Sequence, residues 1–410
     1  MKRWFLTLLN PKGVFFQNIG TQRTVENKIP QTVGYYLAFI SLGLVAALLG
    51  PTLTKLAAQT SSPINEISIL ISARAFGYMI GSLISGNLYD RFPGHPVLFG
   101  VMMVIALVVS AVPFVYTLWL LIVLMFIMGI ADGTLDVGGN TMLIWTHDDK
   151  VGPFMNALHF FWGVGAWISP IIVAVVLSLM GGIAGAYWLV ALCLLPPALY
   201  LLRLPSPPPL KHTNAEGRAS RKTDYRLVAL ISLFFFLYVG GESGFGSWVA
   251  AYTFKSGMTS EANAAYLASA FWGALTVGRL LSVPITARID LRTVILGDLL
   301  VCIASGLMMV LIPNSFIAII LGALGLGLGM ASVFPTMLSL AGKVLTITGR
   351  INGFFFAGAS AGGMILPWVV GQYFEKFGPW VTPFFILSFV TAGLVIYILI
   401  YLYFGKKQNG

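Results

Sequence analysis

The run LWLLIVLMFIMGIADGTLDVGGNTMLIW, residues 118–145, places two carboxylates one helical turn apart in a segment long enough to cross a bilayer. A charged side chain at the centre of a bilayer costs about 2.5–3.5 kcal/mol even on the lenient insertion scale. Because residues four apart share one face of a helix, Asp132, Asp136 and Asn140 form a single polar stripe. An acidic stripe inside a span indicates a site that handles a cation or a proton.

The chain as a whole has the composition of a polytopic membrane protein. Of its 410 residues, 58% are hydrophobic and 9% are charged, whereas a soluble domain carries about 25% charged residues. Mean hydropathy is +0.88. Twelve apolar runs of spanning length are predicted, with limits near 31–58, 64–88, 96–114, 117–145, 153–180, 184–203, 226–254, 262–286, 293–312, 315–341, 351–374 and 379–404.

Basic residues lie almost entirely on one side of these predicted spans. Nineteen Lys and Arg fall in the N-terminal segment, the even-numbered loops and the C-terminal tail, against two on the other side, Lys255 and Lys376. By the positive-inside rule, this asymmetry predicts that both termini are cytoplasmic. The net charge of +10 therefore indicates topology and contact with anionic lipid, and no nucleic-acid partner is expected.

The chain repeats itself at an offset of 197 residues. The matching pairs are Gly43 and Gly240, Gly81 and Gly278, Arg91 and Arg288, Gly100 and Gly297, Gly152 and Gly349, Gly165 and Gly362, and Pro170 and Pro367. Each copy holds six spans, an even number, so the two copies have the same orientation in the membrane. Parallel repeats are typical of transporters that rock two halves around a site near the midplane.

The repeat predicts an all-α membrane protein whose twelve transmembrane helices form two parallel six-helix repeats. The predicted parts are a cytoplasmic N-terminal segment, an N-terminal bundle, a cytoplasmic linker, a C-terminal bundle and a cytoplasmic tail. Their limits are 1–30, 31–203, 204–225, 226–404 and 405–410.

Three further polar residues within predicted spans are candidates for the site. Glu242 has glycines on both sides, which let a helix break as at transporter binding sites, or it pairs with a buried arginine. Arg74 lies near the midplane and needs an acidic partner, for which Asp132 and Glu242 are nearest in depth. His159 either relays protons or hydrogen-bonds a neighbouring helix.

Arg279 lies closer to the predicted cytoplasmic surface than Arg74 does. We expect it to reach that surface or to pair with Asp298. The sequence contains no metal-ligand spacing, phosphate-binding loop or nucleophile elbow, so neither an enzyme nor a metal site is expected.

The second predicted span ends in Gly86-Asn87-Leu88-Tyr89-Asp90-Arg91, which resembles the cytoplasmic loop signature of the major facilitator superfamily. The resemblance implies that Asp90 acts as a latch against neighbouring helix ends, together with Gly86 and Arg91. An ordinary capped loop is the structural alternative. Residues 93–95 replace the usual basic tail of the signature, so a weaker latch is expected.

The fourth and fifth predicted spans carry a more specific resemblance. Asp136–Asn140, Gly152-Pro153, Leu158-His159 and Gly163–Ala166 are similar to the sodium-dependent glucose transporter-like branch of the superfamily. That branch is related to the fucose permeases, in which an acidic residue four before an Asn serves in coupling. Asp136 matches this acidic residue. The fucose permeases also use an acidic residue in the first span, and this sequence has none there.

These observations predict a secondary active transporter with the major facilitator fold, moving a small polar solute by alternating access. A sugar is the favoured solute, and sodium or a proton the expected coupling ion, with no other cofactor. Asp136 is the expected ion site, supported by Asp132 and Glu242. The expected solute contacts are Arg74, Asn140, Asn156, His159, Trp162, Trp248 and Trp272.

Two alternatives are an exporter of drugs or amphipathic lipids and a receptor built on a transporter fold. The expected setting is a monomer in the lipid bilayer of the plasma (inner) membrane.

Overall fold

The computed structural model describes residues 28–208, 224–313, 315–345 and 349–408, and within these ranges the regular elements are all helical. The predicted N-terminal segment, most of the predicted linker and the end of the tail lie outside the described residues. The helices of the N-terminal bundle are α2 (Ile29–Ala46), α3 (Leu49–Gln59), α4 (Ile64–Ile67), α5 (Ile69–Arg91), α6 (Gly94–Ala111), α7 (Leu118–His147), α8 (Val151–Met180) and α9 (Ala184–Leu202). Those of the C-terminal bundle are α10 (Tyr225–Lys255), α11 (Glu261–Thr286), α12 (Leu291–Leu311), α13 (Phe316–Met330), α14 (Val333–Val344), α15 (Gly349–Phe377) and α16 (Val381–Gln408).

The twelve predicted spans are confirmed, because 12 described segments are long and apolar enough to cross a membrane. Three of the spans are broken, between α2 and α3, between α4 and α5, and between α13 and α14. Pro51 and Pro335 stand in the first turn of α3 and α14, where a helix does not need an N–H group.

The repeat is visible in how the helices cross. Gly43 and Gly165 bring α2 against α8, and a side chain at either position would collide with the backbone of the other helix. Their matches at the 197-residue offset, Gly240 and Gly362, bring α10 against α15 in the same way. Small residues at such crossings let membrane helices approach closely. The two bundles therefore share one packing pattern.

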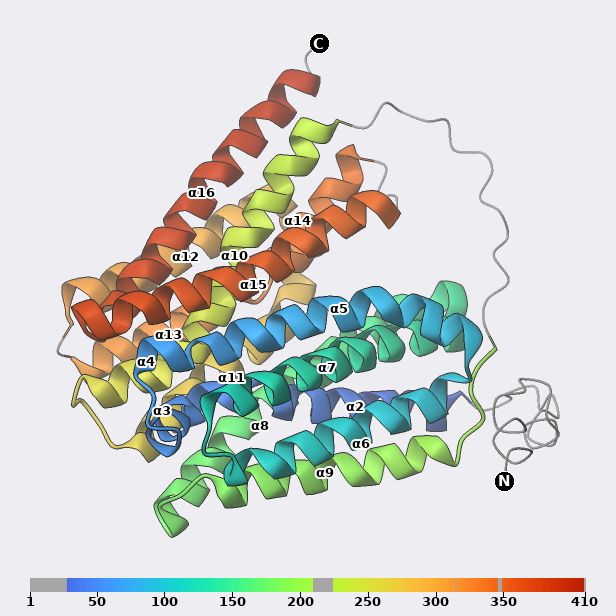
Figure 1. Ribbon diagram of the computed structural model, residues 1–410. Coiled ribbons are helices and arrows are strands. Elements are labelled where there is room, and N and C mark those ends of the chain that lie inside the picture. The colour runs from blue at the N-terminus through green and yellow to red at the C-terminus, as the bar shows by residue number, and fades with distance from the viewer. Residues whose placement is uncertain (1–27, 209–223, 314, 346–348, 409–410) are drawn as a thin grey trace, which may run out of the picture.

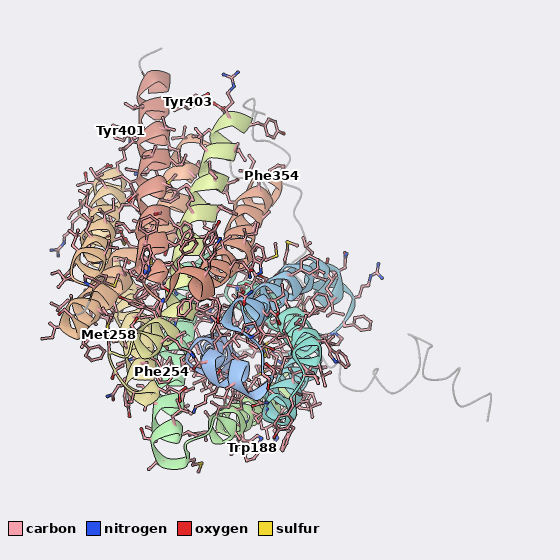
Figure 2. The ribbon with its side chains drawn as sticks, turned by 60° about the vertical axis from the view of Figure 1, so that its left-hand side comes forward. Trp188, Phe254, Met258, Phe354, Tyr401 and Tyr403 are labelled. Carbon is pink, nitrogen blue, oxygen red and sulfur yellow. The ribbon has the colours of Figure 1, made fainter. Side chains whose placement is uncertain are left out.

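The two bundles meet at one end of the molecule and diverge toward the other (Figure 1). We call the end at which α9 ends and α10 begins the linker face, and the other end the opposite face. In Figure 2, Tyr401 and Tyr403 lie at the linker face, and Phe254 and Met258 lie toward the opposite face.

Polar contacts hold the bundles together toward the opposite face. Lys55 forms an ion pair with Glu261 at 2.7 Å. The amide of Ile64 donates to Glu375 at 3.0 Å. Within the described ranges, the residues at the linker-face end of α5, Asp90 and Arg91, are exposed and form no ion pair. These polar contacts between the bundles therefore lie toward the opposite face, and the helices of the two bundles diverge toward the linker face (Figure 1).

Candidate functional site

Helices α5 and α7 lie side by side and carry the polar stripe (Figure 1). Four glycines make this possible, since a side chain at any of them would collide with the backbone of the other helix: Gly77 and Gly81 on α5, and Gly129 and Gly133 on α7. The close approach sets one row of polar side chains on α5 against the acidic row on α7.

The first pair in these rows is Arg74 and Asp132. The Arg74 guanidinium donates to one carboxylate oxygen of Asp132, from Nε at 2.8 Å and from Nη2 at 2.7 Å. Its Nη1 donates to the carbonyls of Val45 and Ala46, at the end of α2, at 3.0 and 3.2 Å. The side chains are only 13% and 3% exposed. That Arg74 contacts a solute stays a prediction; in this conformation its guanidinium hydrogen-bonds Asp132 and the Val45 and Ala46 carbonyls.

The second pair is Tyr78 and Asp136, one turn along each helix. The Tyr78 hydroxyl donates to one carboxylate oxygen of Asp136. The Asn140 side-chain amide donates to the other at 3.0 Å and to the Asp136 carbonyl at 2.8 Å. Asp136 is partly exposed, and among the ion pairs of the described residues none involves it. The two carboxylates of the stripe thus differ, since Asp132 is neutralised by Arg74 and Asp136 is not.

Tyr78 was not predicted from the sequence, although a signal for it was present. It lies four residues after Arg74, so it shares that residue's face of the helix and faces the second carboxylate when Arg74 faces the first.

Helix α8 presents a row of predicted site residues near Asp136. Asn156 and His159 are exposed, and Trp162 is partly exposed one turn farther along. His159 interacts electrostatically with both Asp136 and Arg279. It is therefore within electrostatic range of a carboxylate of the N-terminal bundle and of a guanidinium of the C-terminal bundle.

In the C-terminal bundle, the Glu242 carboxylate is largely buried and forms an ion pair with Arg279. The Tyr238 hydroxyl lies 2.5 Å from Glu242 Oε2, and Arg279 Nη2 lies 3.6 Å from Glu242 Oε1. The Arg279 guanidinium also stacks over the Trp162 ring of the other bundle at 5.5 Å. The expected pairing of Arg279 with Asp298 is wrong, because among the described ion pairs Arg279 has Glu242 as its partner. Asp298 instead accepts a hydrogen bond from Ser332. Arg279 thus belongs to the site.

The tryptophans predicted to contact a solute divide into two groups. Trp162 and Trp272 meet across the junction of the bundles, with ring centroids 5.7 Å apart and an interplanar angle of 81°. Trp272 is buried, and its indole N–H has no acceptor among the described residues. Trp248 is 0% exposed and donates to the carbonyl of Pro367 at 2.8 Å. In this conformation Trp248 therefore packs inside the C-terminal bundle, and its contact with a solute stays a prediction.

The predicted latch lies apart from these residues, at the linker-face end of α5. Asp90 and Arg91 are exposed, and a side chain added at Gly86 would contact nothing within 4 Å. The latch role stays a prediction.

The site as a whole offers an un-neutralised carboxylate, hydrogen-bonding groups and aromatic rings where the bundles meet. The carboxylate of Asp136 can hold a proton or a small cation. Side-chain amides, imidazole and guanidinium can bind the hydroxyls of a polar solute.

Comparisons with known proteins agree with the fold. The model of the Major Facilitator Superfamily matches residues 35–367. Sodium-dependent glucose transporter 1 of Homo sapiens is 30% identical, over 82% of this chain and 71% of that protein. Major facilitator superfamily domain-containing protein 4A of Mus musculus is 24% identical, over 93% and 92%. The crystal structure of the nucleoside transporter NupG is similar in fold, with a TM-score of 0.73 at 14% identity over 92% of this chain and 99% of that chain.

Proposed function

This chain belongs to the major facilitator superfamily, in the branch of sodium-dependent glucose transporter 1, and we propose that it moves a sugar together with sodium or a proton. It is a multi-pass membrane transporter rather than an enzyme. The name of its relatives supports a sugar as the solute and sodium as one candidate ion.

The observation that carries the proposal is the contrast between Asp132 and Asp136. Asp132 is buried against Arg74 and already has its counter-charge. Among the described residues, the Tyr78 hydroxyl and the Asn140 amide are the direct hydrogen-bond partners of the Asp136 carboxylate, so a cation or proton can supply its missing charge. We assign Asp136 as the coupling site and Asp132 as the partner that keeps Arg74 in place.

The solute binds between Asp136 and Arg279 in this proposal. His159, Asn140 and Asn156 hydrogen-bond its hydroxyls, and Trp162 contacts the apolar face of the ring. This assignment is supported by the exposure of His159 and by its interaction with charged groups of both bundles.

We further propose that the linker face is cytoplasmic and that the structure is the inward-open state. The excess of Lys and Arg on that side of the spans supports this orientation. Gly86, Asp90 and Arg91 then form a latch that engages when this face closes. A plasma (inner) membrane location and a monomeric transport unit complete the proposal.

Transport by reconstituted protein tests the function. Proteoliposomes are loaded with unlabelled glucose, and exchange for external labelled glucose is measured without ion gradients. Uptake is then measured with an inward sodium gradient or an inward proton gradient alone. We expect exchange in all cases and accumulation with one gradient, which identifies the ion.

The matched control is Glu66→Gln, at an exposed carboxylate near the opposite face, which should behave like the wild type. Absence of exchange with every sugar in a panel, combined with transport of an amphipathic cation, would favour the exporter. Saturable sugar binding without exchange would favour the receptor.

A further inference from the structure

The indole N–H of Trp272 is a buried donor without an acceptor. Trp272 is 8% exposed, and its Nε1 has no hydrogen-bond partner among the described residues. Its backbone carbonyl, by contrast, accepts a hydrogen bond from the Thr276 hydroxyl at 2.7 Å. A buried tryptophan usually finds an acceptor for its N–H, because an unpaired donor away from water costs free energy. The exception at Trp272 therefore points to a partner from outside the protein.

Trp248 shows the ordinary arrangement in the same bundle. It is also buried, and its indole N–H donates to the carbonyl of Pro367 at 2.8 Å. The C-terminal bundle thus contains one buried tryptophan whose donor is satisfied by the protein and one whose donor is not. The two residues form a natural pair for comparison.

The position of Trp272 places its free donor at the proposed solute site. Trp272 and Arg279 are seven residues apart, so they lie on the same face of α11. Trp162 of the other bundle contacts both, at 5.7 Å from the Trp272 ring and 5.5 Å from the Arg279 guanidinium. Two helical turns correspond to about 10 Å along the helix. Trp272 is therefore at the end of the site nearest the opposite face.

The surroundings of the indole ring indicate what kind of ligand supplies the acceptor. The ring contacts those of Trp162 and Phe271, with centroids 5.7 and 5.1 Å away. Its Cε2–Cζ2 edge lies so close to Gly246 of α10 that a side chain there would collide with it. These neighbours carry no charge, and the indole N–H is a neutral donor. The matching group is a neutral acceptor, such as a hydroxyl or ether oxygen of a sugar.

We propose that the Trp272 N–H donates a hydrogen bond to one oxygen of the solute and thereby determines which oxygen the solute must carry. This role rests on the proposed function and differs from the apolar ring contact expected from the sequence. Because the N–H is buried in this conformation, the contact forms as the bundles rearrange around the solute. A solute that lacks the oxygen leaves the buried donor unpaired and is rejected for that reason.

Competition between sugars in proteoliposomes tests the proposal. Exchange of labelled glucose is measured with unlabelled glucose, its five deoxy analogues or 5-thioglucose as competitor, which together remove or replace each oxygen in turn. The wild type is compared with Trp272→Phe, which keeps an aromatic ring but removes the N–H. Trp188→Phe makes the same change at an exposed position on α9 and should match the wild type.

The expected result is selective for one oxygen. In Trp272→Phe the inhibition constant of glucose should rise about 2- to 12-fold, the factor that corresponds to one neutral hydrogen bond. One analogue should inhibit both proteins equally, because it lacks the oxygen that Trp272 binds. Unchanged constants for every competitor, or the same rise for every competitor, would overturn the proposal.

Unfolding of the ligand-free protein gives a second measurement that needs no sugar. Trp272→Phe and Trp248→Phe remove the same atoms from buried positions, but only Trp248 loses a hydrogen bond. The unfolding midpoint should therefore fall less in Trp272→Phe than in Trp248→Phe. An equal or larger fall would show that the Trp272 N–H already has a partner, contrary to the proposal. A wild type that exchanges no sugar would instead contradict the proposed function.

Gly246→Ala tests the same donor in case Trp272→Phe does not fold. Its methyl group would lie 2.5 Å from Trp272 Cζ2, so the indole must move, whereas at Gly241 on the same helix the nearest atom is 3.7 Å away. We expect the inhibition constant of glucose to rise in Gly246→Ala and to stay at the wild-type value in Gly241→Ala. Equal constants in these two variants would contradict the role of Trp272.

Discussion

Breaking the Arg74–Asp132 pair should destabilise the N-terminal bundle strongly. Both side chains are largely buried, at 13% and 3% exposure. Removing one partner of a buried ion pair leaves an uncompensated charge and costs about 3–5 kcal/mol. Arg74→Met also removes the guanidinium donor of the Ala46 carbonyl and one of two donors of the Val45 carbonyl, and an unsatisfied buried acceptor costs about 1–3 kcal/mol. We therefore expect Arg74→Met to be less stable than Asp132→Leu.

The double variant separates the charge from the carbonyls. With Arg74→Met and Asp132→Leu combined, no unpaired charge remains, and replacing a buried pair by apolar groups is often neutral. The remaining loss is that of the carbonyl donors, about 1–3 kcal/mol, which is smaller than the loss in either single variant.

Equilibrium unfolding in mixed micelles measures these differences. The control is Arg288→Gln, at an exposed arginine, which should change the free energy of unfolding by less than about 0.5 kcal/mol. Additive losses in the double variant would show that the two side chains do not depend on each other, contrary to the geometry.

Three other substitutions follow from the packing. Gly129→Val should prevent folding, measured as monodisperse protein after purification, because its side chain would collide with the backbone of α5, whereas Gly100→Val, with open space around it, should be tolerated. Trp248→Phe should lower the free energy of unfolding by about 0.5–1.5 kcal/mol through the lost hydrogen bond, while the KM for sugar stays unchanged; a raised KM would return Trp248 to the site. Lys55→Glu should slow sugar exchange by opening the opposite face, and adding Glu261→Lys should restore it; no recovery would mean that the pair does not hold that face closed.

Much of the fold was predictable because its signals are local. Length and hydropathy locate the spans, and glycine spacing reveals the repeat, since each depends on residues within one helix. The stripe on residues 132–140 follows from helical periodicity alone. Breaks within spans were missed because a short interruption leaves the hydropathy of the segment unchanged.

Which partner a charged residue has depends on which helices pack against each other, and the sequence alone does not give this packing. The predicted depths of Asp132 and Glu242 in the membrane made both of them candidate partners of Arg74. Only the packing of α5 on α7 selects Asp132. Depth also misplaced Arg279, because distance along a helix does not say which neighbour a side chain faces. The burial of Trp248 was not predictable, because the same aromatic residue type serves equally in a buried core and in a binding surface.

The role of Asp136 can be measured in one preparation. Asp136→Asn removes the charge but keeps the size of the side chain and its hydrogen bond with Tyr78. We predict that proteoliposomes containing this variant still exchange labelled for unlabelled sugar, but no longer accumulate sugar when the wild-type coupling gradient is applied. Accumulation at the wild-type level by Asp136→Asn would contradict the assignment of Asp136 as the coupling site.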